Sequence, residues 1–275
     1  MKIALATHTS DVIQPPPVAL LSGTFEERLE KAGRLGYAGV ELMVARPSQL
    51  NPTLIQNQVK AAGLEIAAVA SGPIFMLDGL TLLAEKEETS QLAVKRLGEL
   101  IRLANQLSAP LVTIGSFRGR LSWAGGLPAK DRLVKILQSA ADLAQTQGVR
   151  LVLEPLNRYE TDLIRNSTEG LAFCSEVGSE VFGLVLDTFH MNIEESNLPS
   201  AIRSSMAAGK LWHIHLGDSN RYAPGQGHID FAGLVKTLIS CNYRGYLSAE
   251  LLPVPNPDAA AAETITFMRR LVPGG

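Results

Sequence analysis

Short apolar runs recur along the chain and alternate with longer segments of helical spacing. The runs are mostly continuous in hydrophobicity rather than strictly alternating, which is typical of strands that are covered on both faces. We expect eight strands, at KIALAT from Lys2, AGVELMV from Ala38, EIAAVAS from Glu65, PLVTIGS from Pro110, VRLVLEP from Val149, FGLVLDT from Phe182, LWHIHLG from Leu211 and GYLSAELL from Gly245.

The segments between these runs repeat their apolar residues at helical spacing. Thr24 and Glu27, three residues later, form a capping-box pattern that predicts the start of a helix. Several segments close on glycine, as helix C-termini commonly do: Gly36, Gly63, Gly148, Gly178 and Gly209. We expect eight helices, at TFEERLEKAGRLG, NPTLIQNQVKAAG, TSQLAVKRLGELIRLANQLSA, AKDRLVKILQSAADLAQTQG, NSTEGLAFCSEVG, LPSAIRSSMAAG, HIDFAGLVKTLISCN and PDAAAAETITFMRRL.

Eight strands and eight helices in strict alternation predict an α/β fold, a (β/α)8 TIM barrel. The competing fold is a doubly wound open sheet, which usually has fewer strands and often a glycine-rich turn after the first. Here the first run is followed by HTSDVIQPPPVALLSG, which contains no GxGxxG pattern. No linker or shift in composition divides the chain, so we expect a single domain over residues 1–275.

Composition and charge narrow the classes of function. The chain is 46% hydrophobic, with a formal net charge of -2 and no basic cluster longer than Arg269–Arg270, which argues against nucleic acid as a partner. Two cysteines, Cys174 and Cys241, give no disulfide framework and suggest a reducing compartment. The apolar start is too short for a signal peptide, and no run spans a membrane. We therefore expect a cytoplasmic protein without membrane contact.

Charged or imidazole residues stand at the ends of the last four predicted strands. Glu154, Asp187, His215 and Glu250 occupy these places, and His190 follows Asp187 by three residues. Any one of them alone would more simply be a strand-end residue that is paired with a neighbouring Lys or Arg. Because the carboxyl ends of barrel strands meet at one mouth, the four together predict a site for a divalent cation. Carboxylate oxygens with one imidazole suit Mn²⁺, Mg²⁺ or Co²⁺.

The remaining histidines have simpler interpretations. We expect His213, two residues before His215 on the same strand face, to be a hydrogen-bonded core residue one layer deeper. His228 precedes a helix whose N-cap is Asp230. His8, at the end of the first strand, could line the mouth of the barrel or cap a turn, and the sequence leaves this open.

Four motifs together resemble the sugar isomerase/epimerase superfamily of xylose isomerase-like barrels, and in particular its ketose 3-epimerases, which act on D-tagatose or D-psicose. The motifs are EPLNRYETD, LDTFHMNIEE, HIHLGDSNR and AELL, each on a different strand. The resemblance is detailed in the C-terminal half of the chain and only architectural in the first half. Aromatic residues that the family uses at the far end of the sugar have no assigned counterpart, so the substrate's chain length stays open.

The resemblance implies roles for seven residues. Its metal ligands match Glu154, Asp187, His215 and Glu250, and the ion it implies is Mn²⁺ first, with Mg²⁺ or Co²⁺ as alternatives. Its substrate-contacting residues match Glu160, His190 and Arg221. The ligand is His215 rather than His213 because the family's arginine follows the ligand by six residues, as Arg221 does here. The resemblance also implies a homodimer or homotetramer.

The implied reaction is epimerisation at C3 of a free ketose through a cis-enediolate. A planar intermediate needs one base on each face, and Glu154 and Glu250 lie on strands nearly opposite each other in the ring. A cation that binds the ketone and the neighbouring hydroxyl would stabilise the intermediate.

Other functions remain open. The same site suits an aldose–ketose or hydroxypyruvate-type isomerase. Apurinic endonucleases share the barrel but use extra histidines from its first half, where His8 is the only histidine before His190. A non-catalytic sugar-binding barrel would not need two opposed carboxylates. For a sugar phosphate, the PGQG segment from Pro224 is a weak glycine-rich candidate, so a free sugar is favoured.

Overall fold

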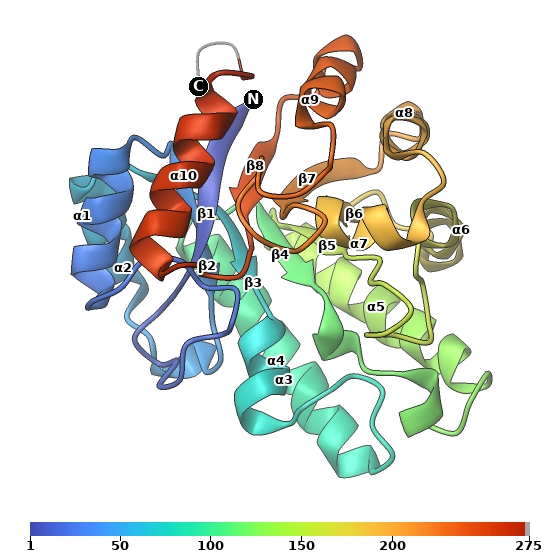
Figure 1. Ribbon diagram of the computed structural model, residues 1–275. Coiled ribbons are helices and arrows are strands. Elements are labelled where there is room, and N and C mark those ends of the chain that lie inside the picture. The colour runs from blue at the N-terminus through green and yellow to red at the C-terminus, as the bar shows by residue number, and fades with distance from the viewer. Residues whose placement is uncertain (273–275) are drawn as a thin grey trace.

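The computed structural model describes residues 1–272, which form a closed barrel of eight parallel strands (Figure 1). Each strand pairs with its neighbours in sequence, and β1 closes the ring against β8. This topology confirms the predicted (β/α)8 barrel. The strands, each overlapping an expected apolar run, are β1 (Lys2–His8), β2 (Gly39–Met43), β3 (Glu65–Ala70), β4 (Leu111–Ile114), β5 (Arg150–Leu153), β6 (Phe182–Asp187), β7 (Leu211–Leu216) and β8 (Tyr246–Ala249).

Helices surround the barrel at the eight expected places. They are α1 (Phe25–Leu35), α2 (Pro52–Ala61), α4 (Glu87–Gln106), α5 (Ala129–Thr146), α6 (Ser167–Val177), α8 (Leu198–Ala207), α9 (Phe231–Ser240) and α10 (Pro257–Arg269). Two further helices were not predicted, α3 (Gly72–Asp78) and α7 (Thr188–Glu194), together with 3-10 turns at Pro47–Gln49, Ser116–Arg118 and Leu121–Trp123. At seven residues each, α3 and α7 are too short to show a helical period.

Local signals explain where helices begin and end. The Thr24 hydroxyl accepts a hydrogen bond from the Glu27 amide while the Glu27 carboxylate accepts one from the Thr24 amide, so the predicted capping box is present. Gly36 ends α1 in the left-handed conformation, at a φ of 85°. Asp230 is the N-cap of α9, as expected, and His228 lies in the segment before it. No helix within residues 1–272 has the length and hydropathy of a membrane span.

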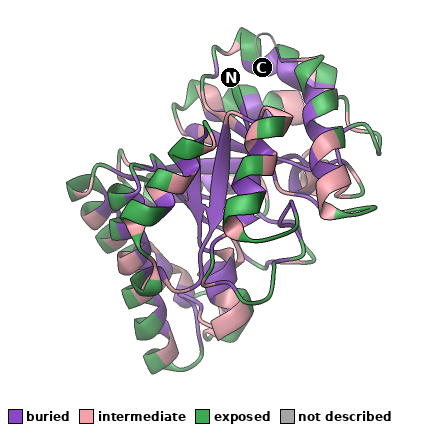
Figure 2. Ribbon diagram, turned by 90° about the vertical axis from the view of Figure 1, so that its left-hand side faces the viewer, coloured by how far each residue is buried: buried purple, intermediate pink, exposed green. Residues whose placement is uncertain are grey.

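Burial follows the layers of the barrel. The strands are buried along most of their length, and the surrounding helices turn one buried face inward and one exposed face to solvent (Figure 2). Residues such as Leu42, Ile114 and Leu184 are fully buried between the sheet and the helices. Cys174 is buried and Cys241 is half-buried, and both are free thiols.

Two irregularities in register lie beside charged residues. Between β2 and β3 the register shifts at Val40/Glu41, and between β6 and β7 it shifts at Leu184/Val185. After the second shift, Asp187 is the direct neighbour of His215. A register shift re-aims the side chains that follow it, so these irregularities determine which residues reach the barrel interior.

Candidate metal centre and active site

Four residues from consecutive strands meet at the carboxyl-terminal mouth of the barrel. Glu154 directly follows β5, Asp187 ends β6, His215 lies in β7 and Glu250 directly follows β8. One potential ligand atom from each of them lies within 4.8 Å of all the others. The strand ends thus bring together the four side chains that sequence analysis selected as metal ligands.

The imidazole of His215 is the centre of this cluster. Its Nδ1 lies 3.1 Å from Glu154 Oε1 and 2.9 Å from Glu250 Oε2. The carboxylate of Asp187 is oriented by its own helix, because its Oδ1 accepts a hydrogen bond of 2.7 Å from the Phe189 amide at the start of α7. Its other oxygen, Oδ2, is buried without a hydrogen-bond partner among residues 1–272.

Burial and charge change the acidity of the cluster. Burial raises the pKa of Asp187 to about 8 and also raises the pKa of Glu154. For Glu250, burial raises the pKa, but the charge of His215 outweighs it and the net shift is downward. Burial lowers the pKa of His215, yet the carboxylates around it raise that pKa well above its usual value. The protonated imidazole, in contact with Glu154 and Glu250, and the nearby guanidinium of Arg221 are therefore the counter-charges that the protein itself supplies.

The residues of this cluster fit a hard divalent cation. Three carboxylates and one imidazole form the type of donor set that suits Mn²⁺, Mg²⁺ or Co²⁺. The unpaired Oδ2 of Asp187 is a second argument, since a buried carboxylate oxygen without a donor is costly and a cation would satisfy it.

A cavity of about 160 Å³ opens beside the cluster. Six of the seven residues selected from the sequence line it, and the seventh, Asp187, is buried at 1% exposure. The six are Glu154, Glu160, His190, His215, Arg221 and Glu250. His8 is not among the lining residues in the described chain. It lies beside Arg28, whose charge, together with burial, lowers the pKa of the His8 ring.

Polar residues line one side of the cavity. Arg221 and Glu160 form an ion pair of 3.2 Å, and the guanidinium lies 5.0 Å from the centre of the Phe189 ring. His190 Nδ1 is 2.8 Å from the side-chain amide nitrogen of Asn157, which orients the ring, and its buried Nε2 has no hydrogen-bond partner in the described part of the chain. These groups offer hydrogen-bond donors and acceptors to a polyhydroxylated ligand.

Apolar residues line the opposite side. Pro16, Pro17 and Val18, from the loop after β1, face this space together with Met43 and Met76. Three consecutive prolines, Pro15–Pro17, mark this loop in the sequence, but nothing there indicated that the loop lines the cavity. Because one wall is polar and the other is apolar, the cavity can bind an asymmetric ligand in a defined orientation.

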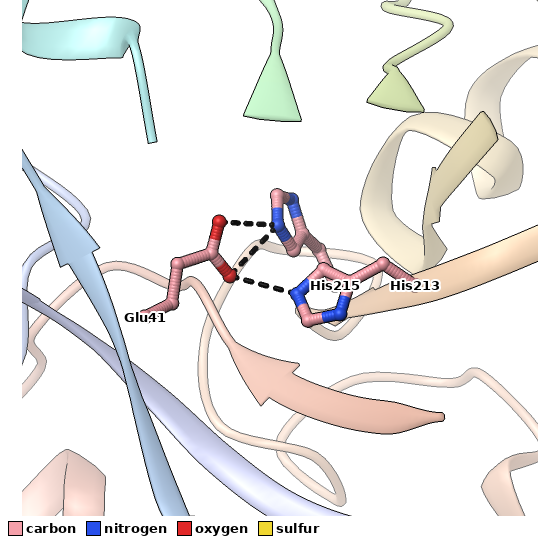
Figure 3. A group of neighbouring side chains, drawn as sticks. All are labelled: Glu41, His213 and His215. Atoms are coloured by element: carbon pink, nitrogen blue, oxygen red, sulfur yellow. Dashed lines mark hydrogen bonds and ion pairs between the residues drawn. The ribbon is translucent and has the colours of Figure 1, made fainter. Parts of the chain in front are cut away.

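Sequence analysis missed one charged residue near the site, Glu41 of β2. Its carboxylate is buried at 1% exposure and contacts the rings of His213 and His215 (Figure 3). Burial raises the pKa of Glu41, but the charges of His215 and His213 hold it well below its usual range. The structure also places His213 as expected, fully buried and hydrogen-bonded at 2.8 Å to Glu41. An acid in the middle of the apolar run AGVELMV was the available signal.

A second missed residue, Arg118, supports the site from behind. It is fully buried and donates to the backbone carbonyls of Glu154 at 2.7 Å, Leu163 at 2.9 Å and Ile164 at 3.1 Å. It therefore ties the end of β5 to the far side of the loop that carries Glu160. Nothing in the sequence around Arg118 distinguishes it from a surface arginine.

Comparisons with known proteins identify the family of this chain. A family model for the xylose isomerase-like TIM barrel matches residues 29–271. An L-ribulose 3-epimerase from Mesorhizobium japonicum is 34% identical over 253 residues, which cover 90% of this chain and 82% of that protein. A D-psicose 3-epimerase from Enterocloster bolteae is 37% identical over 144 residues, which cover 52% of this chain and 46% of that protein.

A solved structure of a related protein has the same fold. A structure of an L-ribulose 3-epimerase superposes with a TM-score of 0.80 and 25% identity, and the match covers 97% of this chain and 93% of the other. The matched region of the family model includes β2 to β8 and therefore all four residues of the candidate metal centre. The chain belongs to the xylose isomerase-like TIM barrel family, and it is an enzyme of the isomerase and epimerase type.

Proposed function

We propose that this enzyme is a ketose 3-epimerase that acts on a free sugar and depends on a divalent metal ion. It is similar over 90% of its length to a protein named L-ribulose 3-epimerase, and over 52% of its length to one named D-psicose 3-epimerase. The observation that carries the proposal is the pair of carboxylates, Glu154 and Glu250, which approach the same nitrogen of His215 and line the same cavity. Epimerisation needs such a pair of acid–base groups around one reacting carbon.

We assign the metal to Glu154, Asp187, His215 and Glu250, with Mn²⁺ as the first candidate and Mg²⁺ or Co²⁺ as alternatives. When bound, the cation supplies Lewis-acid stabilisation for negative charge that develops on the sugar oxygens.

Glu154 and Glu250 are the proposed proton carriers. One carboxylate removes the proton from C3, which leaves the electron pair in a cis-enediolate, and the other carboxylic acid returns a proton to the opposite face. The two side chains come from β5 and β8, three strands apart in the ring. Their roles exchange when the other epimer is the substrate, as microscopic reversibility requires.

Glu160, His190 and Arg221 are the proposed sugar-binding residues. Glu160 and Arg221 form an ion pair at the cavity wall. The carboxylate can accept hydrogen bonds from sugar hydroxyls, and the guanidinium can donate hydrogen bonds to them. The free Nε2 of His190 provides a further polar contact close to the metal ligands, since it lies 3.9 Å from Asp187 Oδ2. A phosphate is not required by these contacts, which favours a free ketose.

The discriminating experiment is a substrate panel. Metal-loaded enzyme should convert L-ribulose, D-psicose or a related ketose to its C3 epimer, without forming an aldose. Products are identified by chromatography and NMR after incubation with ketopentoses, ketohexoses and hydroxypyruvate. Aldose formation, or turnover of hydroxypyruvate alone, would favour the isomerase alternative. Cleavage of an abasic-site oligonucleotide would favour a repair enzyme. A homodimer or homotetramer and a cytoplasmic location stay predictions.

A further inference from the structure

Glu41 is a buried carboxylate that the proposed reaction does not use. It lies on β2, far in sequence from the four candidate metal ligands on β5 to β8. It comes immediately after the register shift between β2 and β3. Its side chain is almost completely excluded from solvent. Because a buried carboxylate is costly unless several donors satisfy it, the identity of those donors indicates what the residue does.

Three donors converge on this carboxylate. His215 Nε2 lies 3.2 and 3.1 Å from its two oxygens, and His213 Nε2 lies 2.8 Å from Oε2 (Figure 3). The Thr113 hydroxyl donates to Oε1 at 3.1 Å. An ionised carboxylate, which only accepts, satisfies all three at once, whereas an amide in its place would turn an N–H group toward one of these donors.

Glu41 thereby determines the role of each nitrogen in the His215 ring. With Glu41 as acceptor, Nε2 carries the proton. Nδ1 is then the nitrogen that faces Glu154 and Glu250, at 3.1 and 2.9 Å. A metal-binding imidazole commonly donates its other N–H to a carboxylate, which sets the ring orientation and strengthens the ligand.

We propose that Glu41 is a positioning residue that holds the Nε2–H of His215, so that Nδ1 is presented to the divalent ion. This inference rests on the proposed metal centre. Glu41 is not among the described residues that line the cavity. It therefore acts through His215 and does not contact the sugar. His213 shares the carboxylate and packs edge-on against the His215 ring, but it is not one of the four candidate metal ligands, which makes it a secondary partner.

The test is the affinity of metal-stripped protein for Mn²⁺, measured by calorimetry without any sugar. We expect Glu41→Gln to weaken Mn²⁺ binding by about 10- to 100-fold, as loss of such outer contacts commonly does. The matched variant His213→Gln changes the other imidazole on the same carboxylate, and we expect its affinity to stay within about threefold of the parent enzyme.

The outcomes separate this inference from the proposed function. Parent-like Mn²⁺ affinity in Glu41→Gln, or equal weakening in both variants, would overturn the positioning role in favour of a general core role. If Glu41→Gln does not fold, Glu41→Asp keeps the charge but shortens the reach, and its affinity should fall at least about 10-fold; parent-like affinity would again overturn the role. A parent that binds Mn²⁺ but turns over no ketose contradicts the proposed function alone, and one that binds no Mn²⁺ contradicts both.

Discussion

The individual carboxylates at the barrel mouth differ in how well the protein satisfies them. Asp187 has one oxygen bonded to the Phe189 amide and one without a partner, and burial raises its pKa to about 8. An acid with a raised pKa binds its proton more tightly in the folded protein than in the unfolded chain. Without metal, the folded state therefore loses stability as the pH rises from about 4, the unfolded value, to about 8.

We accordingly expect Asp187→Asn to stabilise the metal-stripped protein in alkaline solution. At pH 8 the variant should gain at least about 1 kcal/mol in unfolding free energy relative to the parent, because it has no buried carboxylate to ionise. The gain should shrink toward pH 5. Urea denaturation at both pH values, in the presence of a chelator, measures the difference. An equal difference at the two pH values would show that Asp187 does not titrate in this way.

At the residue scale, the sequence predicted those site residues that end apolar strands. Glu154, Asp187 and Glu250 each follow or close such a run, His215 lies one residue before the end of β7, and barrel geometry requires strand ends to meet. Glu41 could not be placed in the same way, because it lies within its strand. Its contact with His215 depends on the register of β2 and on closure of the ring. A local sequence pattern predicts neither of these.

At the scale of elements, the loops after the strands determine how the ligands are presented. Helix α7 starts directly at Asp187, which puts His190 within one turn of it, and this short helix was not predicted. Between β5 and α6, Arg118 donates to backbone carbonyls at both ends of the loop that carries Glu160. The sequence predicted that Glu160 in this loop binds the substrate, but it gave no sign that Arg118, in the 3-10 turn after β4, supports the loop.

The end of β4 has a steric role that can be tested. Gly115 follows this strand, and a Cβ atom built there would lie 2.6 Å from Glu154 Oε2. Gly115→Ala should therefore displace the Glu154 carboxylate, and we expect turnover to fall about 100-fold, since small displacements of a reacting group have such effects.

The matched control for this variant is Gly98→Ala in α4, where the nearest side-chain atoms lie at an ordinary 3.5 Å. Its turnover should remain close to that of the parent. Steady-state kinetics with saturating Mn²⁺, alongside circular dichroism to check folding, measures both variants. Full activity in Gly115→Ala would mean that the Glu154 carboxylate does not need the space left by the missing side chain.

At the scale of the whole molecule, ring closure concentrates negative charge at one end of the barrel. The alternation of strands and helices predicted the closed topology, but it could not predict which side chains face each other across the ring. Glu41, Glu154 and Glu250 all approach the single imidazole of His215. Burial raises the pKa values of Glu154 and Asp187, so their ionised forms destabilise the metal-free fold, and a bound cation should reverse part of this cost.

Metal binding should consequently raise the thermal stability of the enzyme. A free Mn²⁺ concentration of about 100 times the dissociation constant contributes about 2.7 kcal/mol. For a chain of this size we expect the melting temperature to rise by about 5–10 °C relative to protein in chelator. Differential scanning calorimetry measures the shift, and Asp187→Asn should abolish most of it. An unchanged melting temperature in the parent protein would argue against a resident cation.

The most direct test of the central claim, epimerisation by two opposed glutamates at one metal centre, is proton exchange at C3 in deuterated water. NMR should detect deuterium at C3 of both epimers with the parent enzyme. With Glu154→Gln or Glu250→Gln, we expect epimer conversion to fall at least about 100-fold and residual exchange to persist in only one epimer, a different one for each variant. Mn²⁺ content is measured in parallel, to separate loss of a base from loss of the ion. Full exchange of both epimers in both metal-loaded variants would contradict the account.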